Sequence, residues 1–264
     1  MPTPGSPLRG NSSKMSDGEE KKLSVLSHLG EFRKRLIRSV IAVVIASLVS
    51  FIFAKQLFYI LTLPAGGVEL IYIEMTEMIG TYMKVCLAGG LVLAIPYIIY
   101  QGLMFLSPAL TRKEKKYVYL ILPWIALMFI GGVVFGYFIL LPPATRFLLT
   151  FGSDIAIPQI RIGNYISIVT RLLLAIGFAF EMPVITTFLA KIGVIKPKWL
   201  SDRRKTAFIS AFIIAAIITP TFDPINQCLV ALPLIVLYEL SILLAKFVQK
   251  KEVDVIASAP PPTS

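Results

Sequence analysis

The sequence predicts an all-α membrane protein of six kinked transmembrane helices, arranged as a concave, curved bundle whose fifth and sixth helices are short. Two observations carry this prediction. Hydrophobic residues make up 56% of the 264 residues and charged residues only 16%, whereas a soluble domain has about 25% charged residues. The apolar residues also gather in runs of roughly the length that crosses a hydrocarbon core. A soluble globular enzyme and a disordered chain are therefore both excluded.

Six apolar runs are expected to cross the membrane, and no strand signal is visible. The last two runs are short for a full bilayer, which implies local thinning of the membrane or helices that stop part-way. Four runs contain a proline, which removes a helix hydrogen bond and favours a kink. The runs are residues 36–53 (extending to about Leu61), 78–106, 117–141, 166–189, 206–219 and 228–245, and the prolines are Pro96, Pro123, Pro183 and Pro233.

Composition divides the chain into a membrane domain and two tails. Residues 1–22 are rich in Pro, Gly, Ser and charge, so they are expected to form a disordered N-terminal tail. Residues 23–247 hold the six predicted helices. Residues 248–264 end in a Pro-rich stretch and are expected to form a disordered cytoplasmic C-terminal tail.

The basic residues predict the orientation. Eight Lys and Arg lie in the chain up to Arg38, four in the second loop, six in the fourth loop and three in the C-terminal tail. Together these are twenty-one of the 26 Lys and Arg residues, all on one side of the predicted membrane. By the positive-inside rule both termini are cytoplasmic. The net charge of +11 is thus a topology signal, and no nucleic-acid partner is expected.

Glu181 is the sharpest anomaly inside a predicted span. It lies ten residues before Lys191, hence about 15 Å from the cytoplasmic end and near mid-bilayer. It is either a polar contact within the bundle or a docking point for a partner's polar residue or a passing substrate. Glu239, in the sixth run, is either a packing contact or a second such point. Arg171 is too far from Glu181 to pair with it and is expected to snorkel outward.

Two acidic residues stand among cations at the predicted cytoplasmic face. Glu31 precedes Arg33, Lys34 and Arg35, and Glu114 lies between Lys113 and Lys115. One interpretation is charge balance within the chain, which is worth little for each pair. The other is that the two carboxylates receive a guanidinium group through paired hydrogen bonds.

The sequence offers no constellation for catalysis, a metal or a cofactor. His28 is the only histidine, Cys86 and Cys228 lie far apart in apolar runs, and no nucleotide-binding or nucleophile motif is present. An intramembrane protease is disfavoured for the same reason. A secondary transporter that uses Glu181 and Arg171 for a small solute remains an alternative, but it predicts inverted repeats, and none is visible.

Five segments together resemble the TatC family of twin-arginine translocase subunits. Residues 28–36 are similar to the family pattern HLxELRxRL, with Gly30 and Phe32 as departures. Residues 105–114 resemble FxxPALxxxE, and residues 177–183 resemble GxxFExP. The turn from Ile218 through Asp223 to Gln227 is one residue longer than in the family, and residues 237–239 complete the order.

The resemblance implies a receptor for signal peptides that carry two consecutive arginines. The folded precursor proteins that carry these signals would be exported in a step driven by the proton-motive force. Glu31 and Glu114 would receive the arginines, Arg33 would orient these acids, and Phe105, Pro108 and Leu110 would shape the loop. Glu181, Glu239, Asp223 and Gln227 would be intramembrane polar contacts. The implied partners are TatA- and TatB-type single-span subunits, further copies of the chain and the lipid of the cytoplasmic (inner) membrane.

Overall fold

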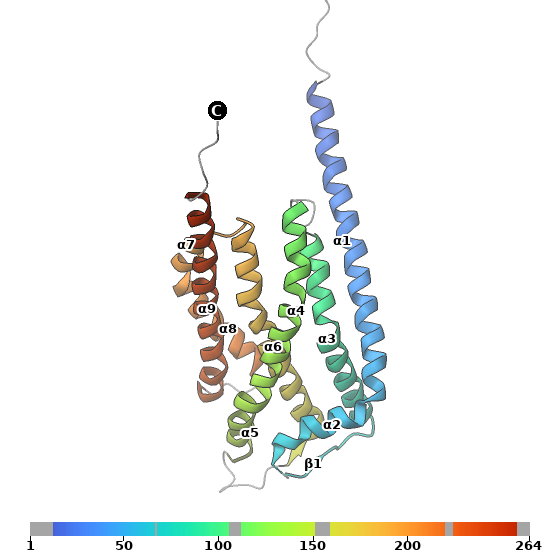
Figure 1. The fold of residues 1–264 in the computed structure, drawn as a ribbon. Coiled ribbons are helices and arrows are strands. Elements are labelled where there is room, and N and C mark those ends of the chain that lie inside the picture. The colour runs from blue at the N-terminus through green and yellow to red at the C-terminus, as the bar shows by residue number, and fades with distance from the viewer. Residues whose placement is uncertain (1–12, 67, 106–111, 151–158, 220–223, 258–264) are drawn as a thin grey trace, which may run out of the picture.

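The computed structural model describes residues 13–66, 68–105, 112–150, 159–219 and 224–257, nearly all of them in helices (Figure 1). The elements, in chain order, are α1 (Ser13–Ile52), α2 (Ala54–Thr62), the 3-10 turn η1 (Leu63–Ala65), β1 (Leu70–Ile71), α3 (Glu77–Phe105), α4 (Arg112–Phe135), the π-helical turn η3 (Gly136–Leu140), α5 (Leu141–Thr150), β2 (Ile160–Arg161), α6 (Ile162–Lys191), α7 (Pro197–Asp202), α8 (Arg204–Ile218) and α9 (Pro224–Ala257).

Five helical stretches of the described chain are long and apolar enough to cross a membrane. They are Leu29–Ile52, Glu77–Phe105, Lys116–Leu148, Ile162–Lys191 and Pro224–Gln249. The predicted fifth span, residues 206–219, corresponds to α8, whose 15 residues give a length of only about 22 Å. The chain is thus a helical multi-pass protein, with a short helix where the fifth run was expected.

The prediction of a short sixth helix is wrong. α9 has 34 residues, and its apolar part alone covers 26 residues. It begins at Pro224, four residues before the predicted run, because proline is well suited to the first turn of a helix. Its other end continues through the basic residues after Ala245 as far as Ala257.

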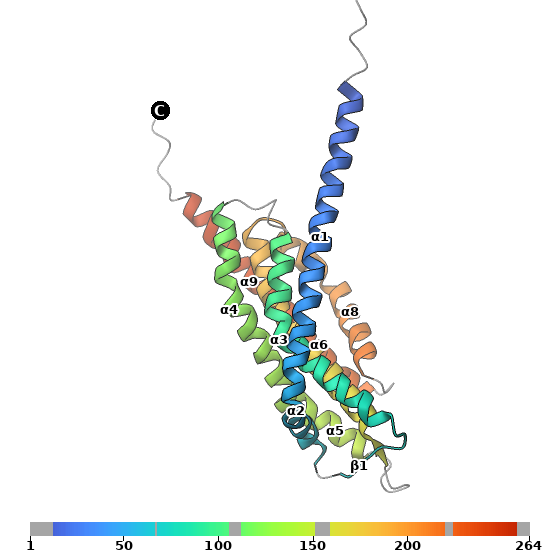
Figure 2. The ribbon, with the colours of Figure 1, turned by 90° about the vertical axis from the view of Figure 1, so that its right-hand side faces the viewer.

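Two further differences lie at the end of the first span. The predicted extension to Leu61 is interrupted at Phe53, after which α2 turns across the end of the bundle (Figures 1 and 2). The chain also contains a parallel pair of strands, Leu70 opposite Ile160 and Ile71 opposite Arg161. Each strand has two residues, too few for an alternating pattern to reveal them in the sequence.

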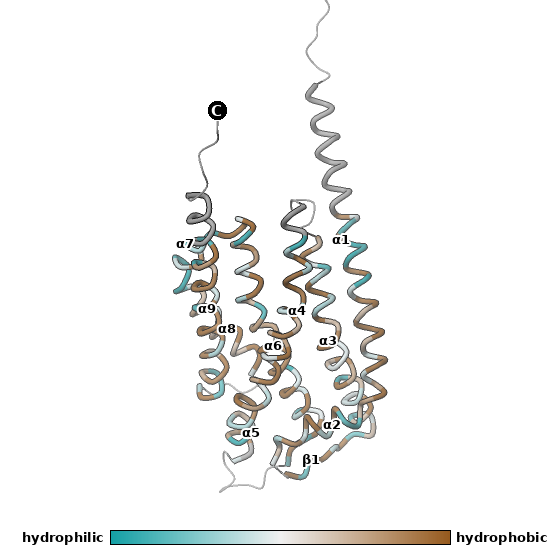
Figure 3. The backbone as a smooth tube through the Cα atoms, viewed as in Figure 1, coloured by the Kyte–Doolittle hydropathy of each residue, from teal (hydrophilic) through white to brown (hydrophobic). Residues whose placement is uncertain are grey.

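The helices pack around α6. α1 packs on α3, while α3, α4 and α9 all contact α6, and α8 lies against α9. The main core cluster draws many buried residues from α6, among them Ile166, Val169 and Ile176, none of which is exposed. Most other apolar side chains face outward: Leu48 and Ile52 of α1 are 67% and 74% exposed. Between the two ends of the bundle the helices are mostly apolar along their length (Figure 3), as expected of helices in contact with lipid.

All four predicted intraspan prolines lie inside helices, namely α3, α4, α6 and α9. The concave outline that they were expected to produce stays a prediction. So does the division into a membrane domain and two tails. α1 begins at Ser13 and α9 reaches Ala257, so helix extends into both segments that the sequence assigns to tails.

The two ends of the bundle differ in charge. One end of the bundle, at the top of Figure 1, contains the start of α1, the end of α3, the start of α4 and the end of α9. We call it the basic end. The described basic residues there are Arg33, Lys34, Arg35, Arg38, Lys116, Lys191, Lys196, Lys198, Arg203, Arg204, Lys205 and Lys246.

We call the opposite end, with α2, β1 and β2, the clamp end, because Arg161 ties the two strands to the start of α3. Its Nη2 atom lies 2.9 Å from Glu77 and 3.1 Å from Glu74. Glu77 also accepts the backbone N–H groups of Ile73 and Gly163, each at 3.2 Å. The hydrogen bonds to Glu77 and then to Glu74 raise the pKa of the Arg161 guanidinium above its ordinary value.

Candidate functional site

Glu31 is held in place by a residue one helical turn away. Arg35 donates from Nη2 and Nε to the same carboxylate oxygen, Oε1, at 2.6 and 3.1 Å. This spacing of four residues places both side chains on one face of α1. The Glu31 side chain remains 34% exposed, and within the described chain its Oε2 atom accepts no hydrogen bond. The carboxylate is therefore oriented but still has one oxygen to offer.

Arg35 also fastens this acid to the neighbouring helix. Its Nη1 atom donates to Oε1 of Gln101 in α3 at 3.2 Å, and Gln101 in turn donates from Nε2 to the Tyr97 hydroxyl at 2.7 Å. Gln101 is only 5% exposed. A buried amide with both its oxygen and its nitrogen bonded holds a fixed orientation, so it limits where Arg35 and Glu31 can move.

An aromatic contact completes the junction between α1 and α3. The rings of Phe32 and Phe105 meet edge to face, with centroids 5.5 Å apart, a favoured arrangement of aromatic pairs. The sequence marked Phe32 as a departure from the family pattern and Phe105 as a loop-shaping residue. The structure brings these two side chains together beside Glu31.

Other predicted site residues at this end are placed only in part. Arg33 is exposed, and no carboxylate of the described chain pairs with it; Arg35, not Arg33, orients Glu31. Glu114 lies in the first turn of α4, but its side chain is outside the described part of the structure. Pro108 and Leu110 also lie outside the described residues. The juxtaposition of Glu31 and Glu114 therefore stays a prediction.

Glu181 is buried within the chain itself. Its side chain lies between α6 and α4 and is 1% exposed. The carboxyl group faces the backbone of Phe129, yet neither oxygen forms a hydrogen bond with any group in the described residues. A buried polar group without a partner costs free energy, so the carboxyl group of Glu181 is a costly side chain in this position.

Two of the other predicted intramembrane contacts, Glu239 and Gln227, lie on α9. Glu239 is exposed and pairs with Arg204 of α8 at 2.8 Å. Gln227 donates from Nε2 to the backbone oxygen of Phe212 at 3.1 Å, which ties the start of α9 to α8. Asp223 lies outside the described residues. Glu239 and Gln227 thus join α9 to the short helix α8.

Sequence reasoning missed the network behind Glu31. The spacing of Glu31 and Arg35 was a usable signal, because oppositely charged residues four apart on a helix commonly pair. Gln101 and Tyr97 had no such signal, since their role depends on how α3 packs on α1. Among the described residues no group of three or more His, Cys, Asp or Glu could hold a metal ion.

The proposed proton and substrate relay of a small-solute transporter receives no support from the apolar groove between the helices. An apolar groove of about 530 Å³ lies between α2, α3, η3 and α6, and neither Glu181 nor Arg171 lines it. Arg171 is exposed on the outside of α6. Neither residue of the proposed relay therefore lines this groove.

Comparison with known proteins gives a consistent result. A family model described as "Sec-independent protein translocase protein (TatC)" matches residues 27–233. The chain is 42% identical over 239 residues to the protein of that name from Aquifex aeolicus, covering 88% of this chain and 99% of the relative. It is 40% identical over 236 residues to the one from Carboxydothermus hydrogenoformans, covering 89% and 97%.

Solved structures agree. A crystal structure of the twin-arginine translocase receptor TatC superposes with a TM-score of 0.76 at 43% identity, covering 84% of this chain and 99% of that chain. The likeness extends over nearly the whole length of each of these proteins.

Proposed function

We propose, from the premise that this chain belongs to the TatC family and is a receptor subunit of the twin-arginine translocase, that Glu31 and Glu114 bind the two arginines of a signal peptide. As a member of this family the chain is a protein-transport subunit and not an enzyme. What remains to be argued is where the peptide binds and how the chain lies in the membrane.

The observation that carries the proposal is the orientation and exposure of the Glu31 carboxylate. A basic surface repels a twin-arginine peptide, so the binding spot must reverse the local sign of the charge. Glu31 has a carboxylate oriented by Arg35, 34% exposed and with Oε2 open. Arginine can meet such a carboxylate with its planar fork, whereas lysine offers only a point charge. Glu114, in the first turn of α4, would supply the second acid.

The two acids alone cannot supply the affinity. An exposed ion pair contributes roughly 0.2–1 kcal/mol. The apolar part of the signal peptide would add most of the binding free energy by burying its surface against the spans. The acids would then select arginine and set the register, while apolar burial retains the peptide.

We infer that the basic end faces the cytoplasm, with both termini on that side of the cytoplasmic (inner) membrane and with α8 as the fifth of six spans. The distribution of Lys and Arg supports this orientation. A helix as short as α8 would require a thinned bilayer or would stop part-way through it.

The same proposal assigns the polar residues of the spans to partner contacts. Glu181 has two oxygens without partners in the described chain and is 1% exposed. Once α4 and α6 move apart, a polar group from a TatA- or TatB-type single-span subunit, or from the inserting signal, would satisfy these oxygens. Glu239 and Gln227 lie at the contact of α8 with α9, and Asp223 precedes α9. These residues would form the edge at which such subunits, or further copies of the chain, assemble for export driven by the proton-motive force.

Photo-crosslinking of a twin-arginine precursor to membranes tests the proposal. Glu31→Gln and Glu114→Gln should each reduce the crosslink to a small fraction of the wild-type value, because each removes a charge but little volume. Glu69→Gln is the matched control, since Glu69 is an exposed glutamate near the clamp end, and it should leave the crosslink unchanged. Wild-type crosslinking in both acidic-site variants, with normal membrane insertion, would refute the role.

A further inference from the structure

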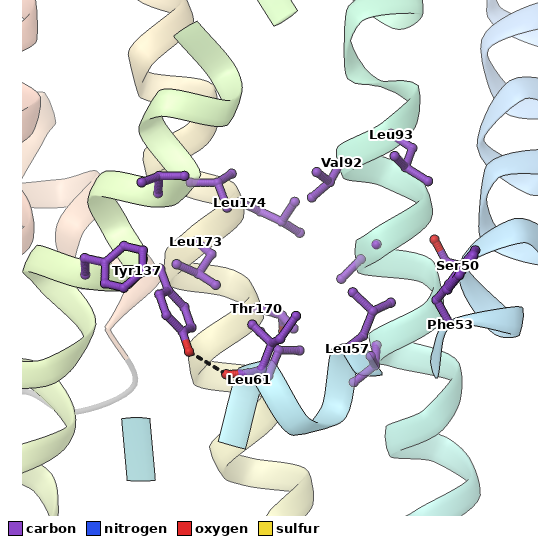
Figure 4. Close-up of a pocket in the computed structure, with 17 residues that line it drawn as sticks. Ser50, Phe53, Leu57, Leu61, Val92, Leu93, Tyr137, Thr170, Leu173 and Leu174 are labelled. Carbon is purple, nitrogen blue, oxygen red and sulfur yellow. Dashed lines mark hydrogen bonds between the residues drawn. The ribbon is translucent and has the colours of Figure 1, made fainter. Parts of the chain in front are cut away.

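A groove of about 530 Å³ with apolar walls lies toward the clamp end. Its walls come from α1, α2, α3, α4, η3 and α6 (Figure 4), and Val92 of α3 and Leu174 of α6 reach into it from opposite sides. Two of its three hydroxyl groups are directed elsewhere: Tyr137 donates to the backbone oxygen of Ile60 at 2.8 Å, and Thr170 donates to that of Ile166 at 2.6 Å. The third, Ser50 of α1, lies against Gly89 of α3 at the edge of the groove. The groove therefore offers a ligand apolar contact and little hydrogen bonding.

The groove opens toward the membrane. Several of its lining residues are themselves well exposed, namely Phe53, Ile60, Leu93 and Phe138, at 53%, 48%, 60% and 68%. Thr170 and Leu174 lie eight and twelve residues into α6, or about 12–18 Å from its start. That depth matches one half of a hydrocarbon core of about 30 Å, so the groove has the length of a single leaflet.

A second hollow adjoins the groove on the exposed side of α2. It has a volume of about 420 Å³ and is lined by Lys55, Gln56, Tyr59 and Ile60. Ile60 lines both spaces, so the hollow that holds Lys55 and the apolar groove lie on either side of this residue of α2. A cationic side chain beside an apolar groove is the arrangement that a lipid with an anionic headgroup requires.

Lys55 has its charge available. No carboxylate of the described residues pairs with it, in contrast to Arg161 at the same end, which binds two glutamates. It also lies at the right level. The apolar part of α1, Leu29–Ile52, has 24 residues and a length of about 36 Å, which exceeds the hydrocarbon core. Lys55, three residues later, is therefore placed among the headgroups.

We propose that the groove and the hollow together bind one anionic phospholipid. One acyl chain occupies the groove below α2, the phosphate lies against Lys55, and the hydroxyl of Tyr59, a residue that is 69% exposed, donates a hydrogen bond to it. The orientation given under Proposed function makes this a lipid of the outer leaflet. Binding itself depends on neither that orientation nor signal recognition.

The charge favours lipid over a signal peptide as the occupant. A twin-arginine peptide carries positive charge and would be repelled by Lys55, whereas a phosphate is attracted to it. A transmembrane helix is about 10 Å across with its side chains, and a 20-residue span is about 30 Å long, so a groove of about 530 Å³ is too small to enclose one.

Native mass spectrometry of the full chain in detergent, with added dioleoyl phosphatidylglycerol or dioleoyl phosphatidylcholine, tests the proposal. The wild type should retain one phosphatidylglycerol in preference to phosphatidylcholine. Lys55→Glu should lower phosphatidylglycerol retention about fivefold or more and remove the preference, since one cation at a membrane surface is worth about that factor. Arg146→Glu is the matched control, an exposed cation of α5 outside both hollows, and it should behave as the wild type.

Filling the groove tests the acyl-chain half. Val92→Phe should reduce retention of both lipids, and Leu174→Phe should do the same from the opposite wall if the first variant fails to fold. Leu232→Phe, on a lipid-facing surface of α9 that is 64% exposed, is the control. Equal retention in the Lys55 and Arg146 variants, or unchanged retention with the groove filled, would overturn the proposal. The proposal would also be overturned if the groove-filling variants lost the precursor crosslink but kept lipid binding. No precursor is needed for the lipid measurement, so its result is independent of the signal-binding test.

Discussion

Arg35 and Arg33 are two residues apart, yet the structure gives them different tasks. Arg35 is 17% exposed, binds Glu31 with two donors and reaches Gln101 with a third. Arg33 is exposed and pairs with no carboxylate of the described chain. The resemblance assigned the orienting task to Arg33, but the contacts assign it to Arg35, because a planar guanidinium can bond a carboxylate and an amide at once.

Arg35→Lys should therefore weaken capture of a twin-arginine signal about three- to fivefold, since lysine loses the fork that holds Glu31. Arg33→Lys should change capture by less than twofold, because it keeps the charge of an unpaired residue. The measurement is crosslinking yield at limiting precursor concentration. A large loss for Arg33→Lys with none for Arg35→Lys would reverse the two assignments.

Replacing Glu181 with an apolar residue should raise the stability of the chain and lower its transport activity. Its oxygens have no hydrogen-bond partner in the described chain, and an apolar residue of similar size removes that cost. Glu181→Met should therefore raise the stability of the purified chain by about 1–3 kcal/mol, seen as a higher Tm, while export falls.

Glu181→Gln should retain more export than Glu181→Ala, because the amide can still form hydrogen bonds with a partner. Equal defects in these two variants would argue against a hydrogen-bonding role. A folded Glu181→Met chain with a lower Tm would show that the carboxyl group stabilises the isolated subunit.

The pairing of α1 with α3 depends on a glycine. A Cβ atom built on Gly90 would lie about 2.5 Å from the backbone of Ser47, so the two helices approach more closely than any side chain allows. Close approach at small residues is a common means of packing helices within lipid, where the hydrophobic effect between helices is absent. This contact sets the distance between Arg35 of α1 and Gln101 of α3.

Gly90→Leu should separate α1 from α3 and reduce the yield of folded protein in detergent. Gly102→Leu is the control, because a Cβ on Gly102 meets nothing within 4 Å in the described structure. Size-exclusion chromatography and thermal melting report the outcome. Similar folding of both variants would contradict the proposed close packing.

The elements that the sequence predicts best are those with long apolar runs. Long apolar runs located α3, α4 and α6 to within a few residues, and the prolines in their interiors did not end them. The prediction failed where contacts between distant segments decide the structure: α9 begins at Pro224, four residues before the predicted run, the strands have only two residues each, and Gln101 acquires its role only through packing on α1. Of the candidate site, the acids could be found from their charge, but the residues that hold Glu31 could not.

The orientation of the whole chain can be measured directly. In a variant without Cys86 and Cys228, a single cysteine at Lys198 of α7 should react with an impermeant thiol reagent only from the cytoplasmic side, and one at Lys55 of α2 only from the opposite side. This follows from the positive-inside rule applied to the basic end. The reverse labelling pattern would invert the orientation and remove Glu31 from the compartment that supplies precursors.

Co-purification from detergent of the wild-type chain with a twin-arginine precursor, compared with the same precursor carrying two lysines, tests most directly whether an acidic site within the basic end recognises the signal. The twin-arginine precursor should be retained and the twin-lysine precursor largely lost, and Glu31→Gln should abolish the difference between them. Equal retention of both precursors by the wild type, or an undiminished preference in Glu31→Gln, would contradict the account.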